Sequence, residues 1–381
     1  MKTNSKLFFS SIALTVILTI GVISCKDKPK TEDPKPIVPA LPVDLKVDTL
    51  LNNLANPWGL AFLPDNSILI TEKSGKLLRY ENGLVTEISG LPAIQTSGQA
   101  GLMDIQLHPD YATNGWLYFT ASIQDGAGMS TALFRAKLDG NTLASLQKLF
   151  QADPKTGSTA HFGSRIVFDK QNHVYVSLGE RNDPTQAQNT SNHSGSVVRL
   201  NDDGTVPADN PYVGNAAYKP EIWTYGHRNP QGMTVHPQTG TIWLHEHGPK
   251  GGDEINLISK GNNYGWPLAT FGVNYNGSTI TPDTFVAGTV LPIYYWVPSI
   301  APCGMTFYYS DVIPQWKGNL FLGALAGKHL NRLEIAGEKV VKEERLLQNF
   351  ARFRAVKQGP DGYLYFVTET PGYLGRYRPK S

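Results

Sequence analysis

The sequence has little of several features that would point to a familiar class of protein. It holds only two cysteines among 381 residues, Cys25 and Cys303, and its formal net charge is +2 at pH 7. Its Lys and Arg residues are scattered rather than gathered in a stripe, which argues against a nucleic-acid-binding surface. It also lacks the GxGxxG and GxxxxGK[ST] fingerprints, so nicotinamide, flavin and nucleotide chemistry on the usual folds has no support.

The N-terminus has the features of an export signal. A basic start precedes an apolar run over residues 7–23, which is short for a membrane span and is interrupted by Ser and Thr. The segment VISC, which ends at Cys25, resembles the bacterial lipoprotein box. This resemblance implies removal of residues 1–24 and lipidation of Cys25, and a plain secretory peptide is the alternative. Once Cys25 is lipidated, Cys303 has no cysteine partner within the chain.

Residues 25–44 are rich in proline and charge, which predicts a flexible, solvated tether rather than a folded element. The folded domain is expected over residues 45–381. We therefore expect an exported lipoprotein that is attached to a membrane only through its lipid, at the outer membrane facing the periplasm.

From residue 45 onward the chain shows almost no helical periodicity and repeats one pattern six times. Each copy has a short apolar run, a turn of Pro, Asp, Asn or Gly, and a second apolar run. A strand pair of this size cannot bury its own face, and the spacing leaves room for two further strands per copy. The pattern predicts an all-β six-bladed β-propeller with four-stranded blades, and a β-sandwich is the alternative. The copies begin at Gly59, Asp104, Arg165, Gly232, Gly304 and Ala355.

Polar residues recur just upstream of the first apolar residue of each copy. Because equivalent strand ends of a propeller meet at one mouth of its channel, we expect these residues to form one site. Arginines gathered there would repel one another unless they bind an anion, so the ligand should be rich in carboxylates. The alternative for any single residue is a structural role at a strand end. The residues are Gln99, His161, Arg228, Asn229, Gln231, Arg352 and Arg354.

Five segments together resemble the soluble glucose and aldose sugar dehydrogenases that depend on pyrroloquinoline quinone (PQQ). They are HFGSRIVF, GHRNPQGM, HEHGPKGGDEINLI, KGNNYGWP and ARFRAVKQGPDGYLY, in this order, and the resemblance runs from about Asn56 to Arg378. That family consists of six-bladed propellers that carry PQQ and calcium. PQQ is a tricarboxylate ortho-quinone, which agrees with the cationic site expected from the repeats.

The resemblance also implies roles for individual residues. His161 stands where the family places its general base, with Glu180 as the acidic residue that orients it. Arg228 would stabilise negative charge on the quinone oxygen, and Trp296 would line the sugar pocket. The remaining cofactor contacts would come from Gln99, Asn229, Gln231, Tyr275, Arg352 and Arg354.

Calcium is expected at two places by the same resemblance. The carbonyls of Gly248 and Pro249 would hold an ion next to PQQ, and Glu254 with the carbonyl of Tyr264 would hold a second, structural ion. A zinc site formed by His245 and His247 is the alternative interpretation of HEHG, although no third ligand stands at a convincing spacing.

One departure from the family pattern concerns the fifth blade. Family members often carry a lysine that meets a cofactor carboxylate where this chain has Ala326, so the resemblance makes Ala326 and Lys328, expected on the same face of one strand, the cofactor-binding positions here. We expect oxidation of the anomeric carbon of aldose sugars to lactones, with electrons passed to a separate acceptor. A sugar- or protein-binding propeller without redox activity and a calcium-dependent lactonase are the alternatives.

Overall fold

The structure, a computed structural model, describes Met1 and residues 44–380. The predicted signal peptide, the lipidation site Cys25 and nearly all of the predicted tether lie outside the described residues. Within residues 44–380, no helix has the length and apolarity needed to cross a membrane.

Six antiparallel sheets of four strands each make up the domain, which confirms the prediction of a six-bladed propeller with four-stranded blades. Blade 1 contains β2 (Pro57–Phe62), β3 (Ile68–Glu72), β4 (Lys76–Glu81) and β5 (Leu84–Ile88). Blade 2 contains β6 (Leu102–Leu107), β7 (Trp116–Asp125), β8 (Gly128–Asp139) and β9 (Thr142–Gln151). Blade 3 contains β10 (Ile166–Phe168), β11 (Val174–Ser177), β12 (Ser196–Leu200) and β13 (Ile222–Tyr225).

The second half of the domain follows the same order. Blade 4 contains β14 (Pro230–Val235), β15 (Ile242–Glu246), β16 (Asp253–Ile258) and β17 (Tyr294–Trp296). Blade 5 contains β18 (Pro302–Phe307), β19 (Leu320–Ala324), β20 (Leu330–Ala336) and β21 (Lys339–Leu346). Blade 6 contains β22 (Phe353–Gln358), β23 (Leu364–Glu369), β24 (Gly372–Pro379) and β1 (Leu45–Leu51). Three short helices, α1 (Tyr111–Asn114), η1 (Pro184–Gln188) and η2 (Pro314–Trp316), lie in connections.

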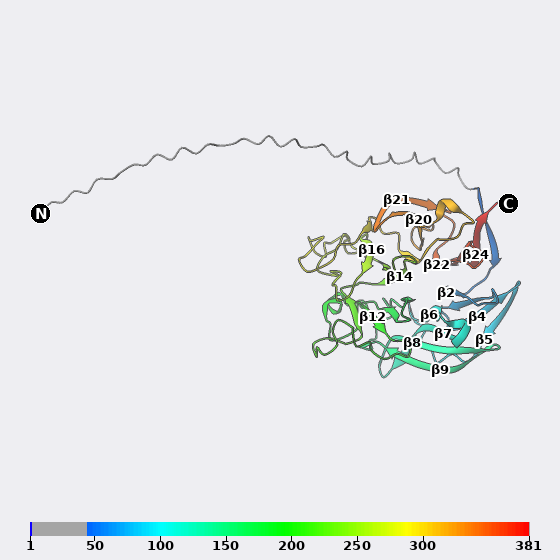
Figure 1. Ribbon diagram of the computed structural model, residues 1–381, viewed down its shortest axis with the longest axis horizontal. Helices are drawn as coiled ribbons and strands as arrows, with labels where there is room; N and C mark the ends of the chain where they lie inside the picture. Colours follow the sequence, from blue (N-terminus) through cyan, green and yellow to red (C-terminus); the bar gives the residue numbers. More distant parts are fainter. Residues whose placement is uncertain (2–43, 381) are drawn as a thin grey trace, which may run out of the picture. The chain divides into compact units, whose positions relative to one another are not determined.

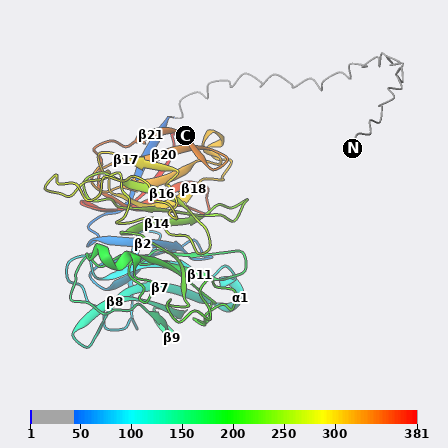
Figure 2. The same ribbon diagram turned by 90° about the vertical axis from the view of Figure 1, so that its left-hand side faces the viewer.

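The first strand of the domain closes the ring. β1 pairs antiparallel with β24, from Leu45 opposite Pro379 to Leu51 opposite Leu374, so both ends of the domain share blade 6. Figure 1 shows this pairing as the blue strand beside the red one. The innermost strands β2, β6, β10, β14, β18 and β22 contact one another in that cyclic order, and β22 contacts β2 again. Figure 2 accordingly shows blades 2 and 5 at opposite ends, with β2 and β14 between them.

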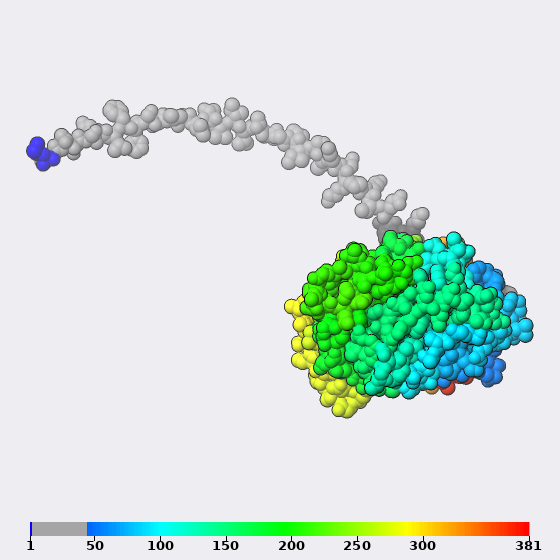
Figure 3. Space-filling model, turned by 90° about the horizontal axis from the view of Figure 1, so that it is seen from below, coloured from blue at the N-terminus to red at the C-terminus, as the bar shows by residue number. Residues whose placement is uncertain are grey.

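Six apolar clusters of the core lie one between each pair of neighbouring blades, and a smaller seventh cluster consists of Trp58, Ala100, Met103, Met129 and Phe162. Both faces of a blade are therefore covered, and strands such as β3 are buried at every position. This explains why the inner strands are apolar runs rich in Ile, Leu and Val rather than strictly alternating sequences. The long connection between β16 and β17 adds Tyr264, Val290 and Ile293 to these clusters, and its yellow atoms mark one edge of the surface in Figure 3.

Candidate active site

A cavity of about 360 Å³ lies where the innermost strands of the six blades begin. Its volume falls within the range of about 300–1,000 Å³ that is usual for sites of small ligands. Residues from every blade line it: Trp58, Lys73, Gln99, Met103, Phe162, Asn229, Gln231, His247, Ala301, Leu325, Arg352, Arg354 and Glu369.

The side chains reach the cavity because five innermost strands are irregular at the same place. β2, β6, β14, β18 and β22 each lose register with the second strand of their blade within their first few residues. Such a bulge turns a side chain away from its ordinary direction. Trp58, Met103, Gln231 and Arg354 are the bulged residues that line the cavity. This is why the polar residues of the repeats stand upstream of the regular pattern.

Five of the predicted cofactor residues meet in this cavity: Gln99, Asn229, Gln231, Arg352 and Arg354. His161 adjoins it, because its backbone N–H donates a hydrogen bond of 2.8 Å to Oε1 of Gln99 and the next residue, Phe162, is part of the lining. Residues separated by more than 250 positions in the sequence are thus neighbours in space.

His161 and Glu180 form a buried pair. Nδ1 of His161 lies 2.5 Å from Oε2 of Glu180, and the two side chains are 9% and 1% exposed. His161 has a φ of 52°. A Cβ at position 179 would lie 2.2 Å from the His161 carbonyl oxygen, so only glycine at position 179 lets the two backbone segments come this close. The carboxylate of Glu180 is an acceptor for the Nδ1 proton, so Nε2 is the ring nitrogen that Glu180 leaves unoccupied.

Arg228 lies beside the cavity and is held by backbone carbonyls. Its Nη1 donates to the carbonyls of His247 at 3.2 Å and Gly248 at 3.0 Å, and its backbone carbonyl accepts from the N–H of Glu180 at 2.9 Å. Arg228 therefore links the segment predicted to hold calcium with the His161–Glu180 pair. Oε2 of Glu246, which the sequence analysis did not select, accepts the Arg228 N–H at 2.6 Å.

The two arginines of blade 6 share one carboxylate. Nε of Arg352 lies 3.2 Å from Oε2 of Glu369, and Nη2 of Arg354 pairs with Oε1 of the same residue. Burial alone would raise the pKa of Glu369, but the charges of Arg354 and Arg352 outweigh it and hold the pKa below its ordinary value. Glu369 was not selected from the sequence, although it neutralises part of the positive charge of Arg352 and Arg354.

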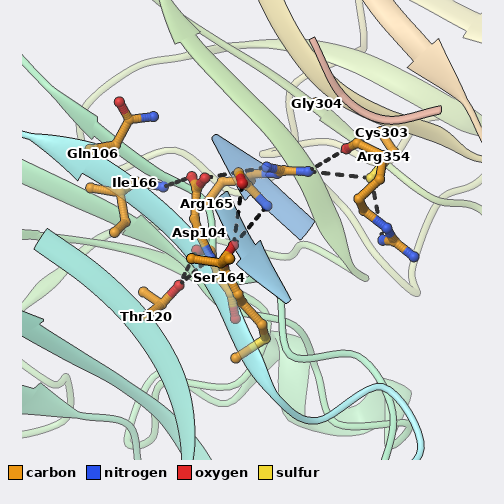
Figure 4. Close-up of polar contacts among 12 residues, drawn as sticks. Asp104, Gln106, Thr120, Ser164, Arg165, Ile166, Cys303, Gly304 and Arg354 are labelled. Atoms are coloured by element: carbon orange, nitrogen blue, oxygen red, sulfur yellow. Dashed lines mark hydrogen bonds and ion pairs between the residues drawn. The ribbon is translucent and has the colours of Figure 1, made fainter. Parts of the chain in front are cut away.

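Arg165 contacts the innermost strand of each of the other five blades, and Figure 4 shows its contacts with Asp104, Cys303 and Arg354. It is 4% exposed, and its guanidinium lies 3.9 Å from the centre of the Trp58 ring. The other contacts are Asp104 at 3.4 Å, the Gln231 carbonyl at 2.7 Å, Cys303 Sγ at 3.4 Å and the Arg354 carbonyl at 2.8 Å. Cys303 Sγ also lies 3.3 Å from Nη1 of Arg354, so Arg165 supports two residues that line the cavity, Gln231 and Arg354.

Asp253 joins the Gly248 segment to the wall of the cavity. Its buried carboxylate accepts from the N–H of Gly248 at 2.9 Å, of Ile300 at 2.8 Å and of Ala301 at 2.9 Å. Ser299 Oγ donates to it as well. Burial raises the pKa of Asp253, and these hydrogen bonds oppose that shift. The residue stands in the DEINL motif, where only its neighbour Glu254 was predicted to act.

Glu254 and Tyr264 line a second, smaller cavity of about 10 Å³ together with Gly248 and Glu246. Glu246 and Glu254 face each other across β15 and β16. Burial, reinforced by the charge of Glu246, raises the pKa of Glu254 well above its usual range. Two buried carboxylates that face each other suit a hard cation such as calcium. The residues of the predicted structural site therefore fit the ion.

The alternative zinc site gains no support from the geometry. Nε2 of His245 lies 3.2 Å from the Gly304 carbonyl, and Nε2 of His247 lies 2.7 Å from the Pro302 carbonyl. Across the described part of the chain, no three side chains of His, Cys, Asp or Glu are grouped as metal ligands. His247 lines the main cavity instead, and burial holds its pKa well below the ordinary value, so it is a neutral wall residue.

Arg228 lines the smaller cavity rather than the main one, and four further predicted cofactor or substrate residues, Tyr275, Trp296, Ala326 and Lys328, line neither. Tyr275 is 72% exposed, and Trp296 is 4% exposed within the apolar cluster between blades 4 and 5, because β17 points it into the blade interface. The expectation that Ala326 and Lys328 share a strand face is wrong. β19 ends at Ala324, and both residues are exposed in the turn that follows. The cavity wall in blade 5 is Leu325 and Ala301.

Comparison with known proteins gives one consistent family. The family described as glucose/sorbosone dehydrogenase matches residues 54–376. The aldose sugar dehydrogenase YliI of Escherichia coli K12 is 43% identical over 352 residues, which cover 90% of this chain and 95% of that protein.

Solved structures agree with this match. The apo form of the soluble aldose sugar dehydrogenase of Escherichia coli has a TM-score of 0.86 and 41% identity, over 88% of this chain and 100% of that one. The PQQ-bound form of an aldose sugar dehydrogenase from Streptomyces coelicolor has a TM-score of 0.74 and 25% identity, over 89% and 99%.

Proposed function

The chain belongs to the glucose/sorbosone dehydrogenase family, and from this premise we propose that it is a PQQ- and calcium-dependent aldose sugar dehydrogenase. In this proposal it oxidises the anomeric carbon of aldoses to lactones and passes the electrons to a separate acceptor. The family membership makes it an oxidoreductase that acts on sugars. Its use of PQQ and calcium and its lactone product are what we propose.

The observation that carries the proposal is the pairing of a cationic cavity with an oriented histidine. Lys73, Arg352 and Arg354 line the cavity beside the amides of Gln99, Asn229 and Gln231, and the His161–Glu180 pair adjoins it. Carboxylates bind well to such a set of charged and amide donors. The residues therefore fit a tricarboxylate quinone, and the PQQ-bound relative supports the choice.

His161 is the proposed general base. With its Nδ1 proton bound to Glu180, Nε2 takes the proton of the anomeric hydroxyl, and the carboxylate stabilises the imidazolium that results. When bound, PQQ supplies the ortho-quinone that accepts the hydride, and with it two electrons, from the anomeric carbon. Loss of that hydride and of the hydroxyl proton converts the hemiacetal to a lactone, so atoms and electrons balance.

The remaining residues hold charge in place. Arg228 stands beside the cavity with its guanidinium fixed by two carbonyls, where it would stabilise negative charge that develops on the cofactor. Gly248 and Pro249 would hold the calcium ion next to the cofactor, and Asp253 fixes the Gly248 segment from behind. Glu254 and the Tyr264 carbonyl, joined by Glu246, would hold the structural calcium ion.

Reconstitution tests this function directly. Purified protein, supplied with PQQ and Ca²⁺, should reduce an artificial electron acceptor only when an aldose is present, and the sugar should be recovered as its lactone. Three control reactions are run: one without PQQ, one with a chelator in place of Ca²⁺, and one with a ketose in place of the aldose. Aldose-dependent reduction without PQQ, or no reduction with both additions, would refute the proposed reaction.

We also propose that the protein is exported and anchored through a lipid on Cys25, since the VISC segment and the proline-rich stretch after it support that reading. Membrane fractions should contain the wild-type protein, and Cys25→Ala should release it. Wild-type protein found only in the soluble periplasmic fraction contradicts the anchor and leaves the proposed reaction unaffected.

A further inference from the structure

The cations that line the cavity differ in what neutralises them. Arg352 and Arg354 both pair with Glu369, which supplies one negative charge to the two of them. Lys73 donates from Nζ to the Gly98 carbonyl at 2.9 Å, and within residues 44–380 no carboxylate lies within 4.0 Å of Nζ. Lys73 therefore raises the net positive charge of the lining from one to two. An ammonium group in a ligand cavity without a carboxylate partner is a ready contact for an anion.

The position of Lys73 is set by its surroundings. Its backbone N–H donates to the Asn56 carbonyl at 3.0 Å, immediately after the end of β3. Gly101 packs against it so closely that a Cβ there would lie 2.5 Å from Lys73 Cγ. The stem of Lys73 therefore runs against the Gly98–Gly101 loop, which also carries Gln99 of the cavity wall. A lysine held in this way loses less freedom on binding than a fully exposed one.

Blade 5 supplies no such cation. Ala326 and Lys328 are exposed in the turn after β19, and neither belongs to the lining. The blade 5 side of the wall is formed by Ala301 and Leu325, which carry no charge.

We propose that Lys73 binds a carboxylate of the cofactor, so that blade 1 supplies a cation to the PQQ site in addition to Arg228, Arg352 and Arg354. This inference rests on the proposed function, because PQQ is the tricarboxylate assigned to the cavity. It adds a cofactor contact from the end of a second strand, whereas all of the arginines predicted from the sequence belong to innermost strands or to the segments just before them.

Titration of the metal-loaded, PQQ-free protein with PQQ tests the inference without measuring turnover. Binding is followed by the quenching of tryptophan fluorescence, because Trp58 lines the cavity. Lys73→Gln should raise the PQQ concentration at half saturation about tenfold, an effect between that of an exposed ion pair and that of a buried charged hydrogen bond. Lys73→Arg should restore most of the affinity, since it keeps the charge.

Two lysines outside the lining serve as matched controls. Lys76, in the same hairpin, pairs with Glu87 at 2.9 Å, and Lys328 is exposed in blade 5. Lys76→Gln and Lys328→Ala should each shift half saturation less than twofold. The loss in Lys73→Gln should also shrink as salt is raised from 20 to 500 mM, because screening removes the contribution of a partly exposed charge.

Three outcomes separate the two proposals. If Lys73→Gln binds PQQ as the wild type does, Lys73 is not a cofactor ligand, although the proposed function stands. If Lys328→Ala weakens binding and Lys73→Gln does not, the additional cation comes from blade 5 and the inference is wrong. If the wild type itself fails to bind PQQ, the proposed function fails and the inference falls with it.

Discussion

Nδ1 of His161 lies 2.5 Å from Oε2 of Glu180, and both side chains are almost completely buried. The pair determines which nitrogen of the imidazole faces the reaction, since a carboxylate that accepts the Nδ1 proton leaves Nε2 free to act as a base. The Glu180 N–H also donates to the Arg228 carbonyl at 2.9 Å, so His161 and Arg228 are both held by Glu180.

His161→Ala should lower turnover by about two to four orders of magnitude, the usual effect of removing a positioned general base. Binding of PQQ should change little, because the contact of His161 with Gln99 is made by its backbone N–H. Turnover per bound PQQ, measured together with a PQQ titration, separates the two effects. Loss of cofactor with normal turnover per bound PQQ would make His161 a binding residue.

Loss of Arg352 and loss of Arg354 should affect the stability of the fold differently, although both residues are proposed to bind the cofactor. Each change to Ala should raise the PQQ concentration needed for half-maximal reconstitution about ten- to a hundredfold. Arg352 is 38% exposed, so its loss should lower the free energy of unfolding by less than about 1 kcal/mol. Arg354 and Glu369 are each 12% exposed, so Arg354→Ala leaves a buried carboxylate without its closest partner and should lower that free energy by about 3 kcal/mol.

Urea unfolding of the two PQQ-free variants measures this difference, and the double variant Arg354→Ala/Glu369→Gln is the control. The double variant should recover part of the lost stability, because no unpaired carboxylate remains. Equal stability of Arg352→Ala and Arg354→Ala would show that the buried Glu369 carboxylate does not need Arg354 as its charge partner.

Asp48 should contribute to closure of the ring, because it joins β1 to β24. Its Oδ2 lies 2.5 Å from Nε of Arg378 and 3.0 Å from Nη2 of Arg376. The hydrogen bond to Arg378, followed by the contribution of Arg376, lowers the pKa of Asp48 below 3.8. The stabilisation is therefore present above pH 3.8, and it is lost as the pH falls through the lower pKa of the folded state.

At neutral pH, Asp48→Asn should lower the midpoint of thermal unfolding by about 1–3 °C, since the carboxylate is partly exposed and such pairs contribute about 0.5–1 kcal/mol. The difference from the wild type should narrow as the pH falls below 3.8. Asp44→Asn is the control, because the Asp44–Lys380 pair is largely exposed. A difference that grows toward acid pH would contradict this assignment.

The repeat pattern predicted the blades because each inner strand pair is local in sequence, and β2, β6, β10, β14, β18 and β22 all follow the six copies. The pairing of β1 with β24 could not be predicted in that way, since it joins residues at the two ends of the domain and β1 has no turn or partner nearby. Closure of the ring becomes visible only when all six blades are in place.

The residues of the candidate site likewise fall into those that the repeat pattern predicted and those that it did not. Residues upstream of the inner strands were found by alignment of the copies, and most of them meet in the cavity. Cavity residues at the ends of the second strands were missed: Glu369 is the last residue of β23, and Lys73, His247 and Leu325 directly follow β3, β15 and β19. Alignment of the copies at the ends of β3, β15, β19 and β23 would have brought these residues together. Asp253 and Arg165 were not detectable, because a buried charge at a strand end has the same sequence appearance as an exposed one.

Arg165 should stabilise the propeller more than any exposed arginine does, because one buried guanidinium contacts the innermost strands of the five other blades. Arg165→Met keeps the length and apolar volume of the side chain but leaves Asp104, which is 3% exposed, without its cation. The free energy of unfolding should fall by about 3–5 kcal/mol, as is usual when one member of a buried ion pair is removed. Arg165→Lys should not restore it fully, since an ammonium cannot reach carbonyls of blades 4 and 6 and the Asp104 carboxylate together.

Urea unfolding of Arg165→Met, Arg165→Lys and the double variant Arg165→Met/Asp104→Asn decides the point, with Arg345→Met, an exposed pair partner of Glu343, as the control. The double variant should be more stable than Arg165→Met alone, because removal of both charges leaves no unpaired carboxylate. Since Gln231 and Arg354 rest on Arg165, PQQ binding should also weaken in Arg165→Met under conditions where that variant is fully folded. If Arg165→Met unfolds at the same urea concentration as Arg345→Met, the contacts of Arg165 with the other five blades do not hold the ring together, and the clusters between blades must account for its stability alone.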